Sequence, residues 1–370
     1  MNLENILPAN IQKLKPYVAG KTIAEVQKEF KPSRISKLAS NENRLGCSPD
    51  VPKAVMNSLN VVHDYPDPIA QRLRKKLAEL HRVDENEILL AAGSESVISI
   101  LCRTFFKNDE NAVTANATFV GFYVQAGVRG VSIKKVPITN DYNFDVDAML
   151  RAVDEKTKMV YIANPNNPTG TYISINEYKR LVENLPEGVF LIADEAYFEY
   201  ARTEPDYPNA LKYRKENVVI LRTFSKAYGL AGFRIGYAIA SEPVIYEMRK
   251  SKLTFEPTTP AQAAAFAALD DQEFIKKSVE LVQKGRERLY TFFENQGVKF
   301  IPSISNSVLM VLDSEEEAIG FTEAMLKQGV ILRRVNGFGL PNCVRITIGT
   351  PDDMKHFEKS YLSITEFKNA

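Results

Sequence analysis

Apolar and polar residues follow two alternating patterns between about residue 68 and residue 240. Short runs that are apolar on both faces are separated by amphipathic stretches with the helical period. Such runs are typical of a parallel sheet covered by helices on each side, so this region predicts a mostly parallel α/β domain. We predict strands at residues 87–92, 112–115, 132–138, 159–163, 189–193, 218–221 and 235–240, and helices at 69–82, 96–106, 120–126, 146–153 and 175–185.

The pattern changes after residue 260. A long charged amphipathic helix is predicted first, and shorter strands and helices follow it, as in a smaller α+β domain. Its elements are helices at 274–296, 315–328 and 352–367 and strands at 307–312, 330–335 and 344–348. Residues 1–34 are polar, with one helical patch at 22–30. We therefore expect an N-terminal arm (1–34), a large domain (35–260) and a small C-terminal domain (261–370).

Composition excludes several classes of protein. The chain has 370 residues, 25% of them charged, and a net charge of +1, which gives no reason to expect nucleic-acid or membrane binding. No signal peptide and no apolar run of about 20 residues is evident, so a cytoplasmic location is expected. The three cysteines lie far apart, and no histidine has metal-ligand spacing, so we expect no metal site. Chemistry must come from another nucleophile or from a cofactor.

Three motifs each follow a predicted strand, where open α/β sheets bind ligands. They are Asn164–Gly170 (N-P-N-N-P-T-G), Asp194–Tyr197 (D-E-A-Y) and Thr223–Gly236. Taken singly, they are typical of a turn, a helix cap and a surface loop. The phosphate loop of nucleotide triphosphatases and the dinucleotide fingerprint are both absent, which disfavours those two classes.

Taken together, the motifs suit an aldehyde cofactor built on a pyridine ring. Lys226 can hold such an aldehyde covalently, and Asp194 can keep the ring nitrogen protonated. The other polar residues of the motifs can donate to a phenolic oxygen (Asn167, Tyr197) or bind a phosphate (Thr223, Ser225, Arg234).

The stretch S-K-x-x-G-L-A-G-x-R-I-G around Lys226 resembles the fold-type I enzymes that use pyridoxal 5'-phosphate (PLP), the aspartate aminotransferase superfamily. The resemblance extends through most of the chain and is strongest to histidinol-phosphate aminotransferases. Six segments carry it, namely residues 15–21, 38–43, 65–67, 92–95, 331–333 and 344–350. It implies a large domain with a mostly parallel seven-stranded sheet and a smaller α+β domain.

The resemblance also implies further site residues. It assigns Gly93, Ser94 and Glu95 to the cofactor phosphate, Phe119 to the pyridine ring, Tyr65 to the partner subunit's cofactor phosphate, and Tyr17, Asn43, Arg333 and Arg345 to the anionic substrate. Residues 93–95 follow a strand and open a helix, so their N–H groups would face an anion. Arg44 stands where the family usually has proline, and it could add positive charge near the substrate entrance.

The reaction implied is transamination of L-histidinol phosphate with 2-oxoglutarate, giving imidazole-acetol phosphate and glutamate, in a homodimer with shared active sites. Lys226 would hold the cofactor and then act as the general base. Three alternatives stay open: an aromatic amino-acid aminotransferase, a threonine-phosphate decarboxylase, and a PLP-sensing transcription regulator. The last would need a basic DNA-binding domain, whereas only a short arm is expected before residue 35.

Overall fold

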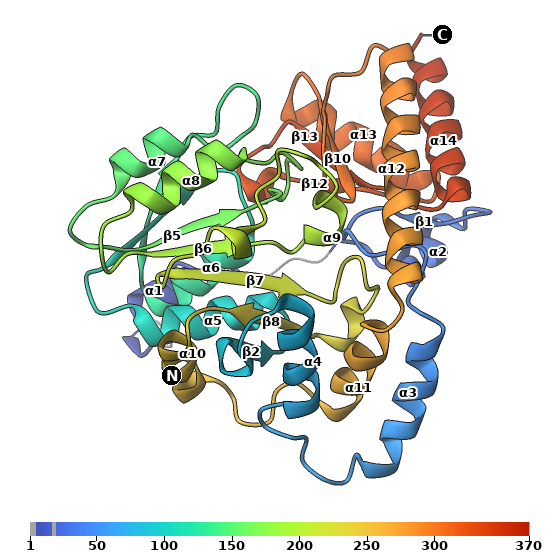
Figure 1. Ribbon diagram of the computed structural model, residues 1–370. Coiled ribbons are helices and arrows are strands. Elements are labelled where there is room, and N and C mark those ends of the chain that lie inside the picture. The colour runs from blue at the N-terminus through green and yellow to red at the C-terminus, as the bar shows by residue number, and fades with distance from the viewer. Residues whose placement is uncertain (1–4, 17–19, 370) are drawn as a thin grey trace.

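The computed structural model describes residues 5–16 and 20–369, and its centre is a seven-stranded sheet (Figure 1). Six strands run in one direction, and only β8 is antiparallel to its neighbours. This confirms the mostly parallel seven-stranded sheet. In spatial order the strands are β2 (Ile88–Ala91), β8 (Gly236–Ile239), β7 (Val218–Thr223), β6 (Phe190–Asp194), β5 (Thr157–Ala163), β3 (Asn111–Ala115) and β4 (Ser132–Val136).

Helices cover both faces of this sheet because its central strands are apolar on both sides. In β5, Tyr161 and Ala163 pack into one core cluster, whereas Val160 and Ile162 pack into the other. The first face is covered by α5 (Ser94–Phe105), α6 (Val120–Arg129) and α10 (Glu242–Ser251). The second face is covered by α4 (Gln71–His81), α7 (Val146–Ala152) and α8 (Ile175–Asn184). These elements agree with the predicted helices and strands, apart from α10, which was not predicted.

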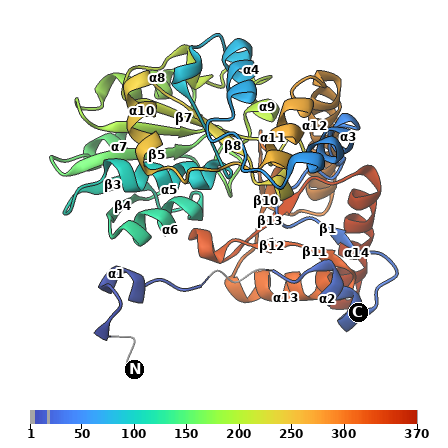
Figure 2. The same cartoon turned by 90° about the horizontal axis from the view of Figure 1, so that it is seen from below.

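The C-terminal part contains a four-stranded antiparallel sheet with long helices beside it (Figures 1 and 2). The order is β12 (Arg333–Arg334), β13 (Cys343–Thr347), β10 (Ser307–Val311) and β9 (Phe300–Ile301). The helices are α12 (Gln272–Asn295), α13 (Glu315–Lys327) and α14 (Pro351–Asn369). The expected α+β arrangement of this region is confirmed.

The single strand predicted at residues 330–335 is wrong. β11 (Val330–Ile331) pairs in parallel with β1 (Ser36–Lys37), whereas β12 pairs with β13 in the other sheet. The backbone changes partners at Leu332, so one short segment serves two sheets. The β1–β11 pair also joins residues 36–37 to the C-terminal part, and the domain boundaries at 34/35 and 260/261 stay predictions.

Two more of the longer helices were not predicted, α3 (Asp50–Ser58) and α11 (Thr259–Ala268), and of these only α11 lacks a clear amphipathic period. α11 is rich in alanine, begins at the Thr258 cap and packs against α4 and α3. The helical patch predicted in the arm is α2 (Ile23–Phe30), which begins with a Thr22–Glu25 capping box. Within the described residues, no helix is long and apolar enough to span a bilayer.

Candidate active site

A cavity of about 570 Å³, its open mouth included, lies at the carboxyl ends of β5, β6 and β7. All seven residues predicted from the three motifs line it: Asn167, Asp194, Tyr197, Thr223, Ser225, Lys226 and Arg234. Ser94, Glu95 and Phe119 from the neighbouring helices line it as well. Three segments that are distant in the sequence therefore meet because their strands end at the same edge of the sheet.

Lys226 presents a primary amine to this cavity from the loop after β7. Its Nζ lies 3.5 Å from the carbonyl oxygen of Ser40 and 5.7 Å from the centre of the Tyr197 ring. Among the described residues, no ion pair involves Lys226, so its amine is available for reaction with an electrophile.

Asp194 ends β6 and is only 3% exposed. Its Oδ1 accepts the Ala196 backbone N–H at 3.1 Å, and its Oδ2 accepts the Tyr161 hydroxyl at 2.7 Å. Burial raises the pKa of Asp194 to about 6, although these two bonds and the charge of Lys226 oppose the rise. No ion pair of the described residues involves Asp194, and a buried carboxylate without a cation is costly. A protonated ring nitrogen in the cavity would supply that cation.

The other end of the cavity suits a phosphate. Gly93 caps α5 with a φ of 92°, and a Cβ at this position would lie 2.9 Å from Arg234 Nη2. The Ser225 hydroxyl accepts the Thr223 hydroxyl at 3.0 Å and Arg234 Nη1 at 3.4 Å. A helix N-terminus, hydroxyl groups and a guanidinium therefore surround one point, as phosphate binding requires.

Two further contacts shape the cavity wall. The ring of Phe119 lies over Gly121, where a Cβ would come within 2.5 Å of the ring. The Tyr197 hydroxyl accepts the side-chain amide of Asn41 at 2.8 Å, and Thr347 donates to Asn41 Oδ1 at 2.9 Å. Asn41, like Tyr161, was not predicted as a site residue. The only signal for it was its place in the S-N-E-N segment.

Two arginines lie directly opposite each other on β12 and β13. Arg333 and Arg345 are partners in the antiparallel register, so their Cβ atoms are about 5 Å apart on one face of the sheet. Arg345 is 5% exposed and donates to Asn167 Oδ1 at 2.5 Å and to the Ala39 carbonyl at 2.7 Å. Asn167 thus connects Arg345 to the cavity, whereas Arg333 lines a second pocket together with Gly20 and Lys21.

The remaining predicted residues lie elsewhere or are engaged. Asn43 donates to the Ala227 carbonyl at 2.9 Å and to Ser278 at 2.8 Å, so it supports the loop after Lys226. Tyr65 is 80% exposed, stacks on Phe255 at 4.2 Å and does not line the cavity. Tyr17 lies outside the described residues.

Arg44 was expected to add positive charge near the substrate entrance. Its Nε instead lies 3.3 Å from Oδ2 of Asp353, which is 2% exposed and sits in the first turn of α14. Arg34 contacts the other oxygen of the same carboxylate at 3.5 Å. The charge of Arg44 is therefore balanced by a buried acid, and its contact is a structural one.

The fold and the cavity define a class of enzyme that transfers amino groups. The chain belongs to the class I and II aminotransferase family, whose model matches residues 33–360. Histidinol-phosphate aminotransferases are among its relatives: that of Geobacillus sp. WCH70 is 42% identical over 348 residues and covers 94% of both chains. That of Bacillus subtilis strain 168 is 41% identical over 345 residues, covering 93% of this chain and 95% of the relative.

Solved structures agree with this assignment. The histidinol-phosphate aminotransferase of Sinorhizobium meliloti, solved in complex with pyridoxal-5'-phosphate, is 26% identical with a TM-score of 0.88 and covers 95% of each chain. The aspartate aminotransferase of Thermus thermophilus with maleate has a TM-score of 0.81 at 22% identity, covering 96% of this chain and 99% of that one. The second likeness concerns the fold alone.

Proposed function

We propose that the protein is a PLP-dependent histidinol-phosphate aminotransferase of histidine biosynthesis, acting in the cytoplasm. It transfers the amino group of L-histidinol phosphate to 2-oxoglutarate and yields imidazole-acetol phosphate and glutamate. One observation carries the proposal: the amine of Lys226, the buried carboxyl of Asp194 and a phosphate cradle line the same cavity. The relatives at 41% and 42% identity, both named as histidinol-phosphate aminotransferases, support the choice of substrate.

The residues present fit PLP: Lys226 would hold its aldehyde, and the N-terminus of α5 with Ser225 and Arg234 would hold its phosphate. When bound, PLP supplies an electrophilic carbon and a protonated ring that accepts the electron pair left at the substrate α-carbon. Asp194 holds the proton on the ring nitrogen. Lys226 Nζ takes the α-proton as general base and returns it one step later. Asn167 and Tyr197 would donate to the phenolic oxygen, and Phe119 would confine the ring.

Arg333 and Arg345 are the residues that we assign to the substrate's anionic group. Two opposed guanidinium groups are more than one carboxylate requires, and a phosphate dianion with three oxygens can engage both. Arg345 must also bind a carboxylate of glutamate or 2-oxoglutarate in the other half-reaction. A planar fork can accept either anion.

A panel of amino donors with 2-oxoglutarate tests this function. Histidinol phosphate should exceed histidinol in kcat/KM by about ten- to a hundredfold for each lost charge-assisted contact. Arg345→Lys should weaken both half-reactions because the fork geometry is lost. Arg333→Ala should reduce kcat/KM for histidinol phosphate more than for glutamate. A higher kcat/KM for phenylalanine or tyrosine would establish the aromatic aminotransferase instead, and release of carbon dioxide the decarboxylase.

We also propose a homodimer in which Tyr65 reaches the neighbouring subunit's cofactor phosphate. Tyr65 is 80% exposed although it is aromatic, and the segment before it exposes further apolar side chains. These are Met56 (70%), Leu59 (52%), Val61 (48%) and Val62 (52%). Several exposed apolar side chains in one short segment favour its burial against a second copy of the chain.

Subunit mixing tests the shared site. Tyr65→Ala and Lys226→Ala proteins should each be inactive alone. In a mixed dimer, one site receives both lesions and the other receives neither, so mixing should restore part of the activity. If subunits demonstrably exchange and no activity returns, each site is self-contained and Tyr65 has no role across the interface.

A further inference from the structure

Tyr161 lies beneath the cofactor cavity in the middle of β5. It precedes Ala163 by two residues, and Ala163 is the register partner of Asp194 on β6, so both side chains point to the same face of the sheet. Tyr161 is fully buried, and the ring of Phe122 stacks on it at 4.3 Å with an angle of 8°. The strand and this stacked ring fix where its hydroxyl points.

That hydroxyl donates to Asp194 Oδ2 at 2.7 Å. Within the described part of the chain, the other bond to this carboxylate comes from the Ala196 backbone, so Tyr161 supplies the side-chain donor. Burial and the adjacent Asp194 raise the pKa of Tyr161 well above its ordinary value, so the hydroxyl keeps its proton and always donates. The charged groups nearest to Asp194 are Lys226, which favours the carboxylate, and Glu195, which opposes it.

We propose that Tyr161 is a positioning residue for the cofactor, whose hydroxyl keeps Asp194 ionised and aimed at the pyridine nitrogen. The inference rests on the proposed PLP function and adds to it a residue that does not touch the cavity. A hydrogen bond to the charged form of an acid favours that form. Without it, the buried carboxyl would bind a proton at higher pH and would be free to turn away from the ring.

The chain offers a matched control in Tyr178 of α8. Tyr178 is as deeply buried as Tyr161, at 1% exposure, but its hydroxyl has no hydrogen-bond partner among the described residues. It lies on the opposite face of the sheet, in the core cluster that contains Val160 and Ile162. Tyr178→Phe therefore removes the same atom from a similar environment without removing a hydrogen bond.

The test is PLP binding by the cofactor-free protein, measured by absorbance between about pH 5 and about pH 9. Tyr161→Phe should weaken PLP affinity near pH 7 by about ten- to a hundredfold, the size expected for a bond to a charged group. The pH at which binding is half lost should also rise by about one unit. Tyr178→Phe should follow the wild type throughout. The phosphate of PLP titrates near pH 6 as well, but equally in all three proteins, so the comparison removes its effect.

A second pair of variants tests the route through Asp194. An amide at position 194 does not titrate, so adding Tyr161→Phe to Asp194→Asn should leave the pH dependence of PLP binding unchanged, and the coupling in the double-mutant cycle should be large. Circular dichroism checks that each variant is folded. If Tyr161→Phe binds PLP as Tyr178→Phe does at every pH, the positioning role is overturned and the proposed function stands. If the wild type binds no PLP at all, both fail.

Discussion

At the ends of β6 and β7, the two faces of the sheet differ in whether a buried charged side chain has a partner of opposite charge. Successive residues of a strand point to opposite faces, so Asp194 and Thr223 reach the cofactor cavity, whereas Glu195 and Arg222 reach the other side. There, Arg222 Nη2 and Nε lie 2.8 and 3.0 Å from Glu195 Oε2, and both side chains are at most 2% exposed. The Ala210 N–H donates to Glu195 Oε1 at 2.9 Å.

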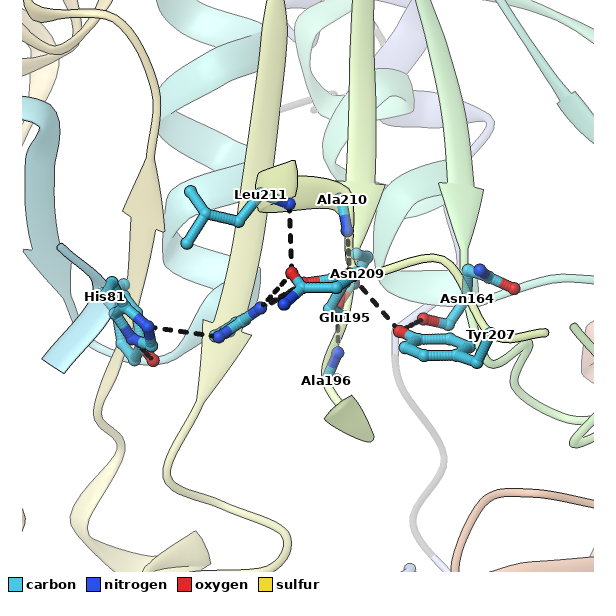
Figure 3. A network of polar contacts seen from close by, with 11 residues as sticks. His81, Asn164, Glu195, Ala196, Tyr207, Asn209, Ala210 and Leu211 are labelled. Atoms are coloured by element: carbon cyan, nitrogen blue, oxygen red, sulfur yellow. Dashed lines mark hydrogen bonds and ion pairs between the residues drawn. The ribbon is translucent and has the colours of Figure 1, made fainter. Parts of the chain in front are cut away.

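A network of polar contacts on this second face is shown in Figure 3. It runs from His81 through the Glu195–Arg222 pair to Tyr207, whose hydroxyl donates to the Asn164 carbonyl at 2.6 Å. Burial and the charge of Arg222 lower the pKa of His81 to about 3, so the imidazole is neutral and accepts from Arg222 through Nδ1. The charges of Glu195 and Arg222 are thus balanced by each other, whereas Asp194 on the catalytic face has no ion pair among the residues that the structure describes. The protonated ring of PLP would supply the cation that the Asp194 carboxylate lacks.

The largest expected effect is on the catalytic face. Lys226→Ala removes both the covalent anchor and the general base, so turnover should fall by about 10⁴-fold or more. The protein should remain folded and retain some PLP through its phosphate contacts. Borohydride reduction of the wild type followed by peptide mapping should place the cofactor on Lys226. Lys250→Ala, at an exposed lysine paired with Glu247, is the control and should be fully active. A label on another lysine would contradict the assignment.

The contiguous part of the site could be predicted from the sequence. Lys226, Ser225 and Arg234 lie in one conspicuous stretch, and Asp194 and Asn167 directly follow apolar runs that read as strands. Tyr161 could not be predicted as a partner of Asp194. It lies 33 residues away inside an apolar run, where a tyrosine looks like ordinary core. Its role depends on which strands are neighbours, and local patterns do not contain that information.

The elements of the fold can likewise be divided into those that local sequence patterns predict and those that they do not. Most amphipathic helices and the buried strands of the sheet were predicted, because their periods are written in consecutive residues, although α3 and α10 were missed. α11 was missed since its alanine-rich sequence has little contrast between its faces. The change of partner at Leu332 was missed because it depends on which distant strand each half of the segment meets.

The next largest effect is that of Asp194→Asn, which is compared with the same change at the neighbouring Glu195. Asp194→Asn should reduce turnover of the PLP-loaded enzyme by about 10²- to 10⁴-fold, because the ring nitrogen loses the group that holds its proton. The fold should persist, since an amide can still accept the Ala196 N–H and donate to the Tyr161 hydroxyl. Steady-state kinetics at saturating PLP measure the loss. Near-normal turnover of the folded, loaded variant would show that Asp194 has no such role.

Glu195→Gln should reduce the stability of the protein rather than its turnover. It removes the charge of the acid that is bonded to the buried Arg222, so the free energy of unfolding should fall by about 3–5 kcal/mol. The kcat of the molecules that remain folded should change little, because neither side chain lines the cofactor cavity. Urea denaturation and kinetics on the same preparation give both quantities. If turnover is lost while stability is unchanged, Glu195 has a catalytic role and the proposed difference between the two faces is wrong.

The smallest effect is the pH dependence that Asp194 confers on the PLP-free protein. The pKa of Asp194 is about 6 in the folded state, against about 3.9 for an unfolded aspartate, so between these values the folded state binds more protons. The contribution of Asp194 to the free energy of unfolding is therefore greatest below about pH 4 and falls as the pH rises toward 6, by up to about 3 kcal/mol in all.

Asp194→Asn tests this pH dependence because an amide does not titrate. The PLP-free variant should be more stable than the wild type at pH 7 to about 8, and the difference should shrink toward about pH 4. Glu199, whose pKa burial raises to about 7, adds a similar slope to both proteins and cancels in the difference. Saturating PLP should abolish the advantage, because the ring then supplies the missing cation. A difference that stays constant with pH would mean that the carboxylate is already satisfied without the cofactor.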